Sequence, residues 1–435
     1  MIFPTLAFQL AHKYPTFRSI LVPLLRLDPD VVHESLYNQM GKLIIGPLKS
    51  VDAPVIITID ALDECQDEEP SSAILSVLGR FVEEIPMVKF FITGRPEPRI
   101  RTGFRLPLLR DATNIFILHG VQPLLVNSDI RLFLKHELSQ LAQRRGLNGW
   151  PSDKDLDILC HRAAGLFVYA VATVKFLDNK TQLPKHQLEV ITQQLPGYTD
   201  PVGKAHFNSK STLDSLYTSI LETAFGGQDP EVYIRVRFAI GAVVLAVNPL
   251  PPLAIAEIIG LEPEDVMLLL TLVESLLIFD GADPTQPVKT FHKSFPDFIT
   301  DPSRCTDTRY YIPPGQLHSN LVMGCLGLMN GRLRPNILSL PNYALNSEVE
   351  DLEMRVKNWI GVGLQYACKS WHGHLAKTEG DTTLIIARLY VFLEEKFLAW
   401  LEVSSVLRAT RGAVTALQQL ILWLQQVCLI SLQHY

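Results

Sequence analysis

The feature that most constrains the fold is an apolar run that ends in acidic residues, Val55 to Cys65, with the sequence VIITIDALDEC. Its first part, Val55 to Ile59, is rich in apolar and β-branched residues, which is typical of a strand buried on both faces of a parallel sheet. Asp60 follows at the end of this strand, and Asp63 and Glu64 come one short turn later. Parallel α/β sheets bind ligands at the carboxyl ends of their strands, so the sequence predicts a polar site there.

A second strand, VKFFIT, is predicted at Val88 to Thr93, after an amphipathic helix over Ser71 to Glu84. Strand, helix and strand with short connections predict a βαβ unit of a parallel sheet. A further apolar run, Ile115 to Leu118, is expected to form a third strand. The carboxyl ends of neighbouring parallel strands meet at one edge of a sheet. We therefore expect Arg95, which follows the second strand, to lie at the same edge as Asp60.

These residue types suit phosphoryl-transfer chemistry. One carboxylate can hold the water shell of a magnesium ion, another can orient an attacking water, and an arginine can stabilise a γ-phosphate. The alternative is structural: DALDE is then a polar turn after a strand, and Arg95 is a surface arginine in the turn GRPEPR. Spacing alone leaves both interpretations open.

The length of 435 residues predicts two to four domains. Helical spacing dominates beyond Val121, where Ser128 is expected to cap a helix that stops at Gly146, and Ser152 to open the next one. Lys180 to Ser211 is rich in Gln, Pro and Lys and is predicted to be a linker. A helix, turn, helix and hairpin pattern after it is the outline of a winged helix. We expect an α/β core, a helical domain with its linker, a winged-helix domain and a C-terminal helical region, over residues 1–125, 126–210, 211–305 and 306–435.

Composition narrows the classes of partner. The net charge is −6, so no basic field is present to attract phosphate backbones, and the second helix of the winged-helix region carries Glu264, Asp265 and Glu274 without Lys or Arg. Both observations argue against nucleic-acid binding. The longest apolar stretch, Phe238 to Val247, is far shorter than the roughly 20 residues that a membrane span requires. Six cysteines without metal-ligand spacing are typical of reduced thiols, so we expect a cytoplasmic protein.

Three motifs in this order carry a family resemblance. IDALDEC followed by FFITGRPEPRI resembles the Walker B and sensor-1 elements of NACHT domains, which are P-loop NTPases of the STAND class, and specifically their nephrocystin-like branch in fungi. FHKSFPDFITDPSRC, at Phe291 to Cys305, is similar to the motif that closes the winged-helix domain in that branch. The helices NSDIRLFL and AAGLFVYAVATVKFL extend the likeness over most of the chain. The implied fold is α/β followed by mostly α, with a truncated P-loop NTPase parallel sheet at its start.

The resemblance assigns roles residue by residue. It implies that Asp60 is the magnesium carboxylate and that Asp63 and Glu64 are catalytic acids that orient water. Arg95 would be the sensor-1 arginine, and His292 would contact the β-phosphate of bound ADP. The implied cofactor is ATP or GTP with Mg²⁺. A lone histidine between a strand and a helix is, however, more often simply packed, so a structural role for His292 stays open.

The phosphate-binding loop of this family does not occur among the 435 residues. The motif GxxxxGK[ST] wraps phosphates with backbone N–H groups, but the two Gly-Lys pairs here are followed by Leu43 and Ala205. We therefore expect the chain to begin after the Walker A segment. We also expect it to lack the C-terminal repeat region of intact relatives, often a WD-repeat propeller.

Two functions remain open at this point. The first is a signal-transduction NTPase module, which in intact relatives acts as a nucleotide-dependent, oligomerising switch and which is catalytically incomplete here. The second is a non-catalytic scaffold or interaction protein derived from such an NTPase. Both predict protein partners or self-association, with no nucleic acid and no membrane.

Overall fold

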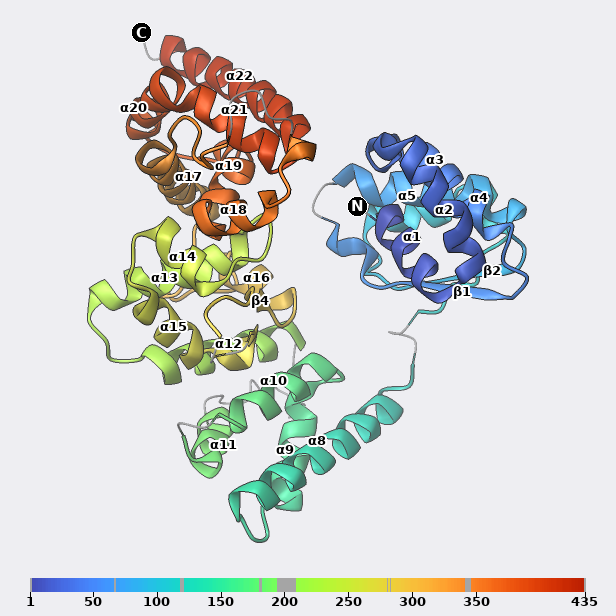
Figure 1. Ribbon diagram of the computed structural model, residues 1–435. Coiled ribbons are helices and arrows are strands. Elements are labelled where there is room, and N and C mark those ends of the chain that lie inside the picture. Colours follow the sequence, from blue (N-terminus) through green and yellow to red (C-terminus); the bar gives the residue numbers. More distant parts are fainter. Residues whose placement is uncertain are drawn as a thin grey trace. The chain divides into compact units, whose positions relative to one another are not determined.

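The structure is a computed structural model that describes residues 2–65, 68–117, 121–179, 182–193, 209–279, 281, 283–340 and 346–433. The chain divides into two compact units, Met1–Gly120 (unit 1) and Val121–Tyr435 (unit 2) (Figure 1). Helices dominate both units, and the sheets formed by the described residues are two pairs of strands. The content of helices and strands agrees with the expected small α/β part within a mostly helical chain.

Unit 1 combines short helices with one parallel pair of strands. Its main elements are α1 Ile2–Lys13, α2 Pro15–Leu27, α3 Leu36–Gln39, the π-helix η2 Met40–Ile45, α4 Gly46–Leu48, β1 Val55–Ile59, α5 Glu68–Phe81, β2 Val88–Ile92, α6 Pro98–Phe104 and α7 Pro107–Arg110. Three short 3₁₀ turns complete it, η1 Pro29–His33, η3 Leu62–Glu64 and η4 Val82–Glu84. β1 and β2 pair in parallel, with α5 between them in the sequence. The predicted strand, helix and strand are therefore confirmed.

The sheet of unit 1 is covered on one face only. Val55, Ile57 and Ile59 point into a core that they share with α1, α2 and α5. On the other face, Ile56 is 74% exposed and Phe91 is 61% exposed. The prediction that this strand is buried on both faces is wrong for the described residues, because the helices of unit 1 pack against one face of the sheet.

The predicted third strand is also not formed. Ile115, Phe116 and Ile117 adopt an irregular conformation and are 66%, 77% and 65% exposed, while Leu118 lies outside the described residues. A strand requires a neighbouring strand for its backbone hydrogen bonds. Within the part of unit 1 that the structure describes, β1 and β2 pair only with each other, so this apolar run has no partner there.

Unit 2 is built mainly from helices around one continuous apolar core. Its first half consists of α8 Pro123–Arg145, α9 Asp153–Ala163, α10 Phe167–Leu177, α11 Pro184–Gln193, α12 Ser209–Phe225, α13 Pro230–Leu245, α14 Pro252–Ile259, α15 Pro263–Leu272, the 3₁₀ turn η6 Glu274–Leu276, β3 Leu277–Ile278, β4 Lys289–Thr290 and α16 Ser294–Ile299. Its second half consists of α17 Pro314–Arg332, the 3₁₀ turn η7 Asn346–Glu348, α18 Leu352–Trp359, α19 Val362–Leu375, α20 Thr383–Val391, the π-helix η8 Phe392–Lys396, α21 Phe397–Val406 and α22 Thr410–Gln433.

The local signals for helix ends have mixed outcomes. Gly146 ends α8 with φ of 66°, and the Ser152 hydroxyl accepts the N–H of Asp155 at the start of α9, as predicted. Ser128 does not cap a helix, because α8 already begins at Pro123. Proline suits the first turn of a helix, where its missing N–H costs nothing.

Part of the predicted linker is helical. α11 lies within Lys180 to Ser211, and its Leu188 and Ile191 are buried in the core of unit 2. Arg162 of α9 donates hydrogen bonds to the carbonyls of Ile191 and Thr192 near the end of α11. These two apolar residues lie three positions apart on α11, which packs against α10 and α12. The amino-acid composition of the segment does not reveal these packing partners. Residues 194–208 of the predicted linker lie outside the described residues.

The elements expected for a winged helix occur in the expected order. α14 and α15 are followed by β3 and β4, which pair antiparallel through Leu277 and Thr290. A single bridge between Leu250 and Val288 lies beside this pair. The strands are two residues long, and the assignment of this region as a winged helix remains a prediction.

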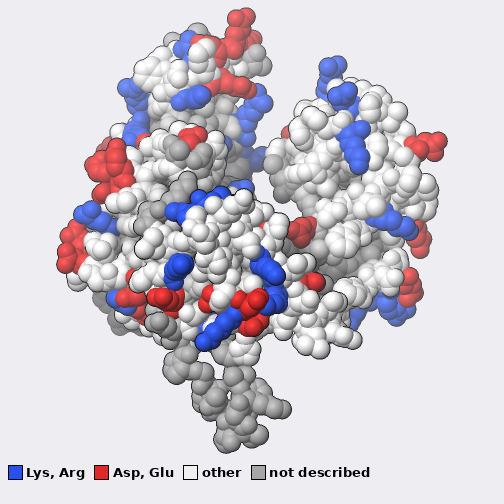
Figure 2. All heavy atoms as spheres, turned by 90° about the horizontal axis from the view of Figure 1, so that it is seen from below, with Lys and Arg blue, Asp and Glu red and all other residues white. Residues whose placement is uncertain are grey.

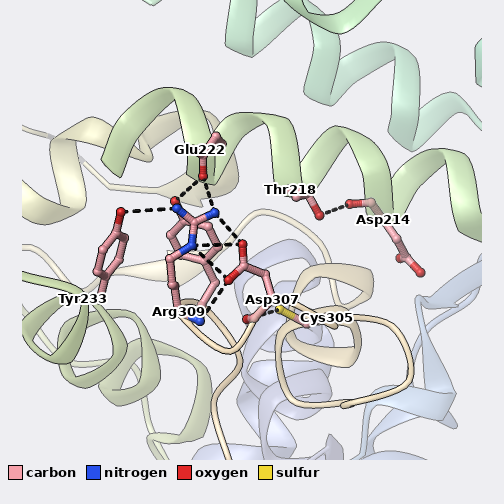
Figure 3. Close-up of polar contacts among 8 residues, drawn as sticks. Asp214, Thr218, Glu222, Tyr233, Cys305, Asp307 and Arg309 are labelled. Atoms are coloured by element: carbon pink, nitrogen blue, oxygen red, sulfur yellow. Dashed lines mark hydrogen bonds and ion pairs between the residues drawn. The ribbon is translucent and has the colours of Figure 1, made fainter. Parts of the chain in front are cut away.

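The segment that follows α16 is fastened to α12 by two arginines. Arg309 donates to both carboxylate oxygens of Asp307 and, at 2.8 Å, to Glu222 of α12 (Figure 3). Arg304 makes a two-pronged contact with Asp214 of the same helix, at 3.1 and 2.6 Å. Charge-assisted pairs of this kind have well-defined geometry, so they fix this segment against α12.

The surface carries charges of both signs. On the face seen in Figure 2, basic and acidic side chains are interspersed among wide uncharged stretches. Among the described residues, no helix combines the length and apolar character that crossing a bilayer requires.

Candidate functional site

Thr93 joins the ends of the two strands in unit 1. Its hydroxyl donates a hydrogen bond to the Asp60 carboxylate and accepts the N–H of Ala61 at 2.9 Å. Its backbone N–H donates to the Ile59 carbonyl at 3.0 Å, and its carbonyl accepts the N–H of Leu62 at 2.9 Å. Asp60 therefore stands exposed at the carboxyl edge of the sheet, as predicted, with its orientation set by a residue of the neighbouring strand.

Asp63 is the buried member of the acidic group. It is 3% exposed, and its Oδ1 accepts the backbone N–H of Arg95 at 3.0 Å. The Nε atom of Arg95 lies 3.6 Å from its Oδ2, and Arg99 donates to its carbonyl oxygen at 3.2 Å. These contacts make Asp63 the anchor of the turn that follows β2. Glu64, the next residue, is exposed.

Arg95 lies at the predicted edge of the sheet. Its side chain is 44% exposed and is paired with Asp63. Strand order along the chain predicts that Arg95 and Asp60 lie at one edge, but it predicts no role for Thr93 or Arg99. The polar string Thr93-Gly94-Arg95 directly after an apolar strand was the available signal for Thr93.

One carboxylate at this edge has the exposure that a contact to a magnesium nucleotide requires. Mg²⁺ keeps several waters and takes one or two protein carboxylates together with phosphate oxygens. Asp60 is an exposed carboxylate held at a strand end, which fits that use. No group of three or more His, Cys, Asp or Glu among the described residues could hold a metal by itself. Asp60 and Glu64 are the exposed carboxylates at this edge that could contact such an ion.

His292 belongs to unit 2 and lies between β4 and α16. Its Nδ1 accepts the backbone N–H of Ser294 at 3.1 Å and lies 2.6 Å from the Ser294 hydroxyl oxygen. That hydroxyl also contacts the Tyr217 hydroxyl of α12 at 2.7 Å. The ring is half-buried, and its neutral form carries the proton on Nε2, because Nδ1 acts as an acceptor.

Comparison with known proteins adds the family context. Residues 1–95, which include all the carboxylates above and Arg95, match the family described as Nephrocystin 3, N-terminal. The chain is 24% identical over 395 residues to vegetative incompatibility protein HET-E-1 of Podospora anserina, a fungal NACHT-domain protein. The match covers 84% of this chain and 26% of that protein, so the chain spans about a quarter of its relative's length. No solved structure matches the chain. The resemblance to nephrocystin-like, fungal NACHT proteins is confirmed.

Proposed function

We propose that this chain is a STAND/NACHT-type signal-transduction module whose magnesium nucleotide, ATP or GTP, contacts the carboxyl edge of β1 and β2. The observation that carries the proposal is the joined strand end, where Thr93 orients the exposed Asp60 and Asp63 holds Arg95. Asp60 would hold the water shell of the metal, and Glu64 would orient water. Arg95 would sense the γ-phosphate. The similarity to HET-E-1 supports the proposal at the level of the family.

Within this proposal Asp63 acts mainly through Arg95. A carboxylate that is 3% exposed and accepts a backbone N–H has little freedom to reach a water molecule beside a phosphate. Its negative charge instead fixes the direction of the guanidinium. The exposed Glu64 is the better placed of the two predicted catalytic acids.

We further propose that these residues by themselves hold nucleotide weakly and do not hydrolyse it. Most of the affinity of a P-loop protein for phosphate comes from backbone N–H groups and the lysine of GxxxxGK[ST]. That string is absent from the 435 residues. In a complete switch, nucleotide exchange would convert a closed ADP form into an open form that oligomerises.

Paramagnetic broadening of NMR signals tests for nucleotide at this site even when the affinity for nucleotide is low. Millimolar Mn²⁺–ADP or Mn²⁺–ATP added to the full chain should selectively broaden the NMR amide signals of Asp60 to Glu64 and Thr93 to Arg95. Asp60→Asn should abolish the effect. Asp52→Asn, which removes an exposed carboxylate before the other end of β1, should not. Uniform broadening, or none at millimolar nucleotide, would overturn the proposal, and release of phosphate from ATP would contradict its non-hydrolytic part.

The open face of the sheet favours a second function, that of a scaffold or interaction protein. Ile56 and Phe91 stand exposed on one face of β1 and β2, and residues 115–117 add further exposed apolar surface to unit 1. Large exposed apolar surfaces mark contact sites in soluble proteins. We propose that this face takes part in self-association or binds a protein partner.

Sedimentation velocity tests whether the chain self-associates through the exposed face of β1 and β2. The double variant Ile56→Lys with Phe91→Lys should be monomeric at concentrations where the unaltered chain associates. Leu268→Lys, which changes a 60% exposed leucine on α15 of unit 2, is the matched control and should associate like the unaltered chain. A monodisperse monomer for the unaltered chain would exclude self-association through this face.

A further inference from the structure

The last helix of unit 2, α22, is held in place by one stripe of its side chains. This stripe is buried in the core of unit 2 and consists of Ala413, Ala416, Leu420 and Trp423. The indole N–H of Trp423 also donates to the Thr378 hydroxyl at 2.9 Å. Within unit 2, α22 packs against α19 and α21 (Figure 1). These contacts determine which faces of α22 point away from the core.

A second apolar stripe runs along α22 beside the buried one. It consists of Val414, Leu417, Ile421 and Leu424, which are spaced by three, four and three residues. This spacing is that of the a and d positions of a heptad repeat, which line one face of a helix. Val414 is 58% exposed and Ile421 is 55% exposed, so no segment among the described residues covers the stripe. We call these four residues the outer stripe.

The residue types of the outer stripe indicate what kind of helix fits on it. Val414 and Ile421 are β-branched and occupy the a positions, whereas Leu417 and Leu424 occupy the d positions. In parallel coiled coils, β-branched residues at a combined with leucine at d favour two strands. The outer stripe therefore matches a second copy of itself, aligned in parallel, in which each a residue faces the same residue of its partner.

The charge of α22 favours the same partner. From residue 412 to residue 433 the helix contains no Asp, Glu, Lys or Arg, and Arg411 lies in its first turn. Gln418 and Gln425 occupy the e positions beside the outer stripe and are exposed. A partner helix of opposite charge gains no ion pair with these uncharged flanks, whereas a second copy meets no repulsion along the stripe.

We propose that α22 is a dimerisation helix, which pairs with α22 of a second copy as a short parallel coiled coil through the outer stripe. This surface lies in unit 2, is separate from the sheet face of unit 1 proposed above and does not involve nucleotide. Unit 2 already holds α22 as a helix, so pairing carries no cost of helix formation.

The length of the outer stripe sets the strength of this contact. Two heptads bury less surface than the roughly 1,200–2,000 Å² of a stable interface, so the dimer is weak. It forms in solution at concentrations near millimolar. A weak contact of this kind becomes effective when other contacts already bring two copies together, because the local concentration is then high. The outer stripe would thus strengthen an assembly that another surface starts.

Sedimentation equilibrium of the full chain tests the pairing. The variant with Ile56→Lys and Phe91→Lys serves as the background, because its sheet face is blocked, and it should dimerise as its concentration approaches millimolar. Adding Ile421→Lys should weaken this dimer at least about tenfold, because two lysines then face each other. Adding Leu422→Lys, which changes a leucine of the same helix that is 59% exposed but lies off the stripe, should leave it unchanged. Tryptophan fluorescence checks that each variant keeps unit 2 folded.

A mixture of two variants tests the parallel alignment. In the same background, Ile421→Lys and Ile421→Glu should each be monomeric alone, and their equimolar mixture should form a heterodimer, because opposite charges then meet at equivalent positions. In an antiparallel pair centred on the stripe, residue 421 lies opposite Leu417 of the other copy, so the mixture should stay monomeric. That result would overturn the parallel coiled coil.

Two further outcomes would overturn the inference as a whole. The first is a background variant that stays monomeric up to millimolar concentration, and the second is a dimer that Ile421→Lys does not weaken. Neither outcome bears on the sheet face of unit 1, which the unaltered chain tests at lower concentration. Loss of association on blocking that face, together with a monomeric background variant, would leave the proposed function standing and remove this one.

Discussion

Unit 1 places its main polar cluster at an exposed sheet edge, whereas unit 2 buries one between helices. In unit 1, Asp60 is exposed and Asp63 anchors the turn behind it. In unit 2, His374 is fully buried, with its Nδ1 2.9 Å from that of His318 and its Nε2 2.7 Å from the hydroxyl of Tyr366. An exposed carboxylate can exchange water for a ligand at little cost. A buried pair of rings must keep its partners, because unpaired polar groups are costly in the core.

This difference assigns separate roles to the two clusters. The edge of unit 1 is suited to binding, and the buried network of unit 2 is suited to fixing how α17 packs on α19. The two units should therefore respond differently to pH and to amino-acid substitution. Tryptophan fluorescence follows unit 2 alone, because all five tryptophans lie beyond residue 120. Hydrogen exchange of the strand amides follows unit 1.

The largest difference between the two units should lie in how their stability depends on pH. Burial lowers the pKa of His318 to about 4 and that of His374 to about 3, from an ordinary value of 6.5. Between these values and 6.5 the unfolded chain binds protons that the folded chain excludes, so the stability of unit 2 is complete above pH 6.5 and falls as the pH decreases below it. From pH 7 to pH 5 the pair should lose about 4 kcal/mol, measured by urea unfolding with tryptophan fluorescence.

A double variant supplies the control for this pH effect. His318→Gln with His374→Gln should flatten the pH dependence even if it lowers stability at pH 7. The strand amides of unit 1 should show no comparable loss, because the described part of that unit contains no buried histidine. Equal urea midpoints for the unaltered chain at pH 7 and pH 5 would contradict the prediction.

The next effect concerns the two faces of β1. Ile57 is 4% exposed and its neighbour Ile56 is 74% exposed. Ile57→Ala should therefore destabilise unit 1 by about 3 kcal/mol, through lost burial and the cavity left behind. Ile56→Ala should cost less than about 1 kcal/mol. Hydrogen exchange of the β2 amides measures both, and equal losses would mean that the outer face is covered in solution.

The loss of an ion pair should destabilise unit 2 more than unit 1, with a smaller difference than the two effects above. Arg304 and Asp214 of unit 2 have side chains that are 18% and 13% exposed. Arg304→Gln leaves this carboxylate without its cation and should cost about 2 kcal/mol by tryptophan fluorescence. In unit 1, Lys42 pairs with Asp28 and Glu34 at the surface, and Lys42→Gln should leave hydrogen exchange unchanged. A loss for Lys42→Gln as large as that for Arg304→Gln would contradict the contrast.

The smallest effect is expected at the strand end of the candidate site. Thr93→Val keeps the shape of the side chain but removes its hydrogen bonds to Asp60 and Ala61, which should cost about 1 kcal/mol. The Ala61 amide should lose protection from exchange. Thr58→Val, at an exposed position of β1, should have no such effect. An unchanged Ala61 amide in Thr93→Val would show that Thr93 does not hold this turn.

Local sequence patterns predicted the polar edge of unit 1 well. The apolar runs at Val55 and Val88 identified both strands, and their order along the chain brought Arg95 to the edge that carries Asp60. Gly146 and Ser152 marked helix ends correctly because a left-handed turn and a side-chain cap involve only neighbouring residues.

The predictions that were wrong share a different cause. The conformations of these segments depend on contacts with distant parts of the chain. Leu188 and Ile191 form a helix in the predicted linker because other helices bury them. Residues 115–117 have an apolar pattern that suits a strand but find no neighbouring strand among the described residues. Pattern alone cannot supply a packing partner.

The sequence alone specified the two parallel strands, the acidic group that follows the first and the arginine that follows the second. It also carried the family resemblance, because short motifs keep their order along the chain. Only the folded chain shows which face of the sheet is covered and that Asp63 is bound to Arg95, a residue 32 positions away. It also shows that Ser294 and Tyr217, 77 positions apart, share one hydrogen bond beside His292. The physical reason is that periodicity is set by neighbouring residues, whereas burial and hydrogen-bond partners are set by contacts between segments far apart in the chain.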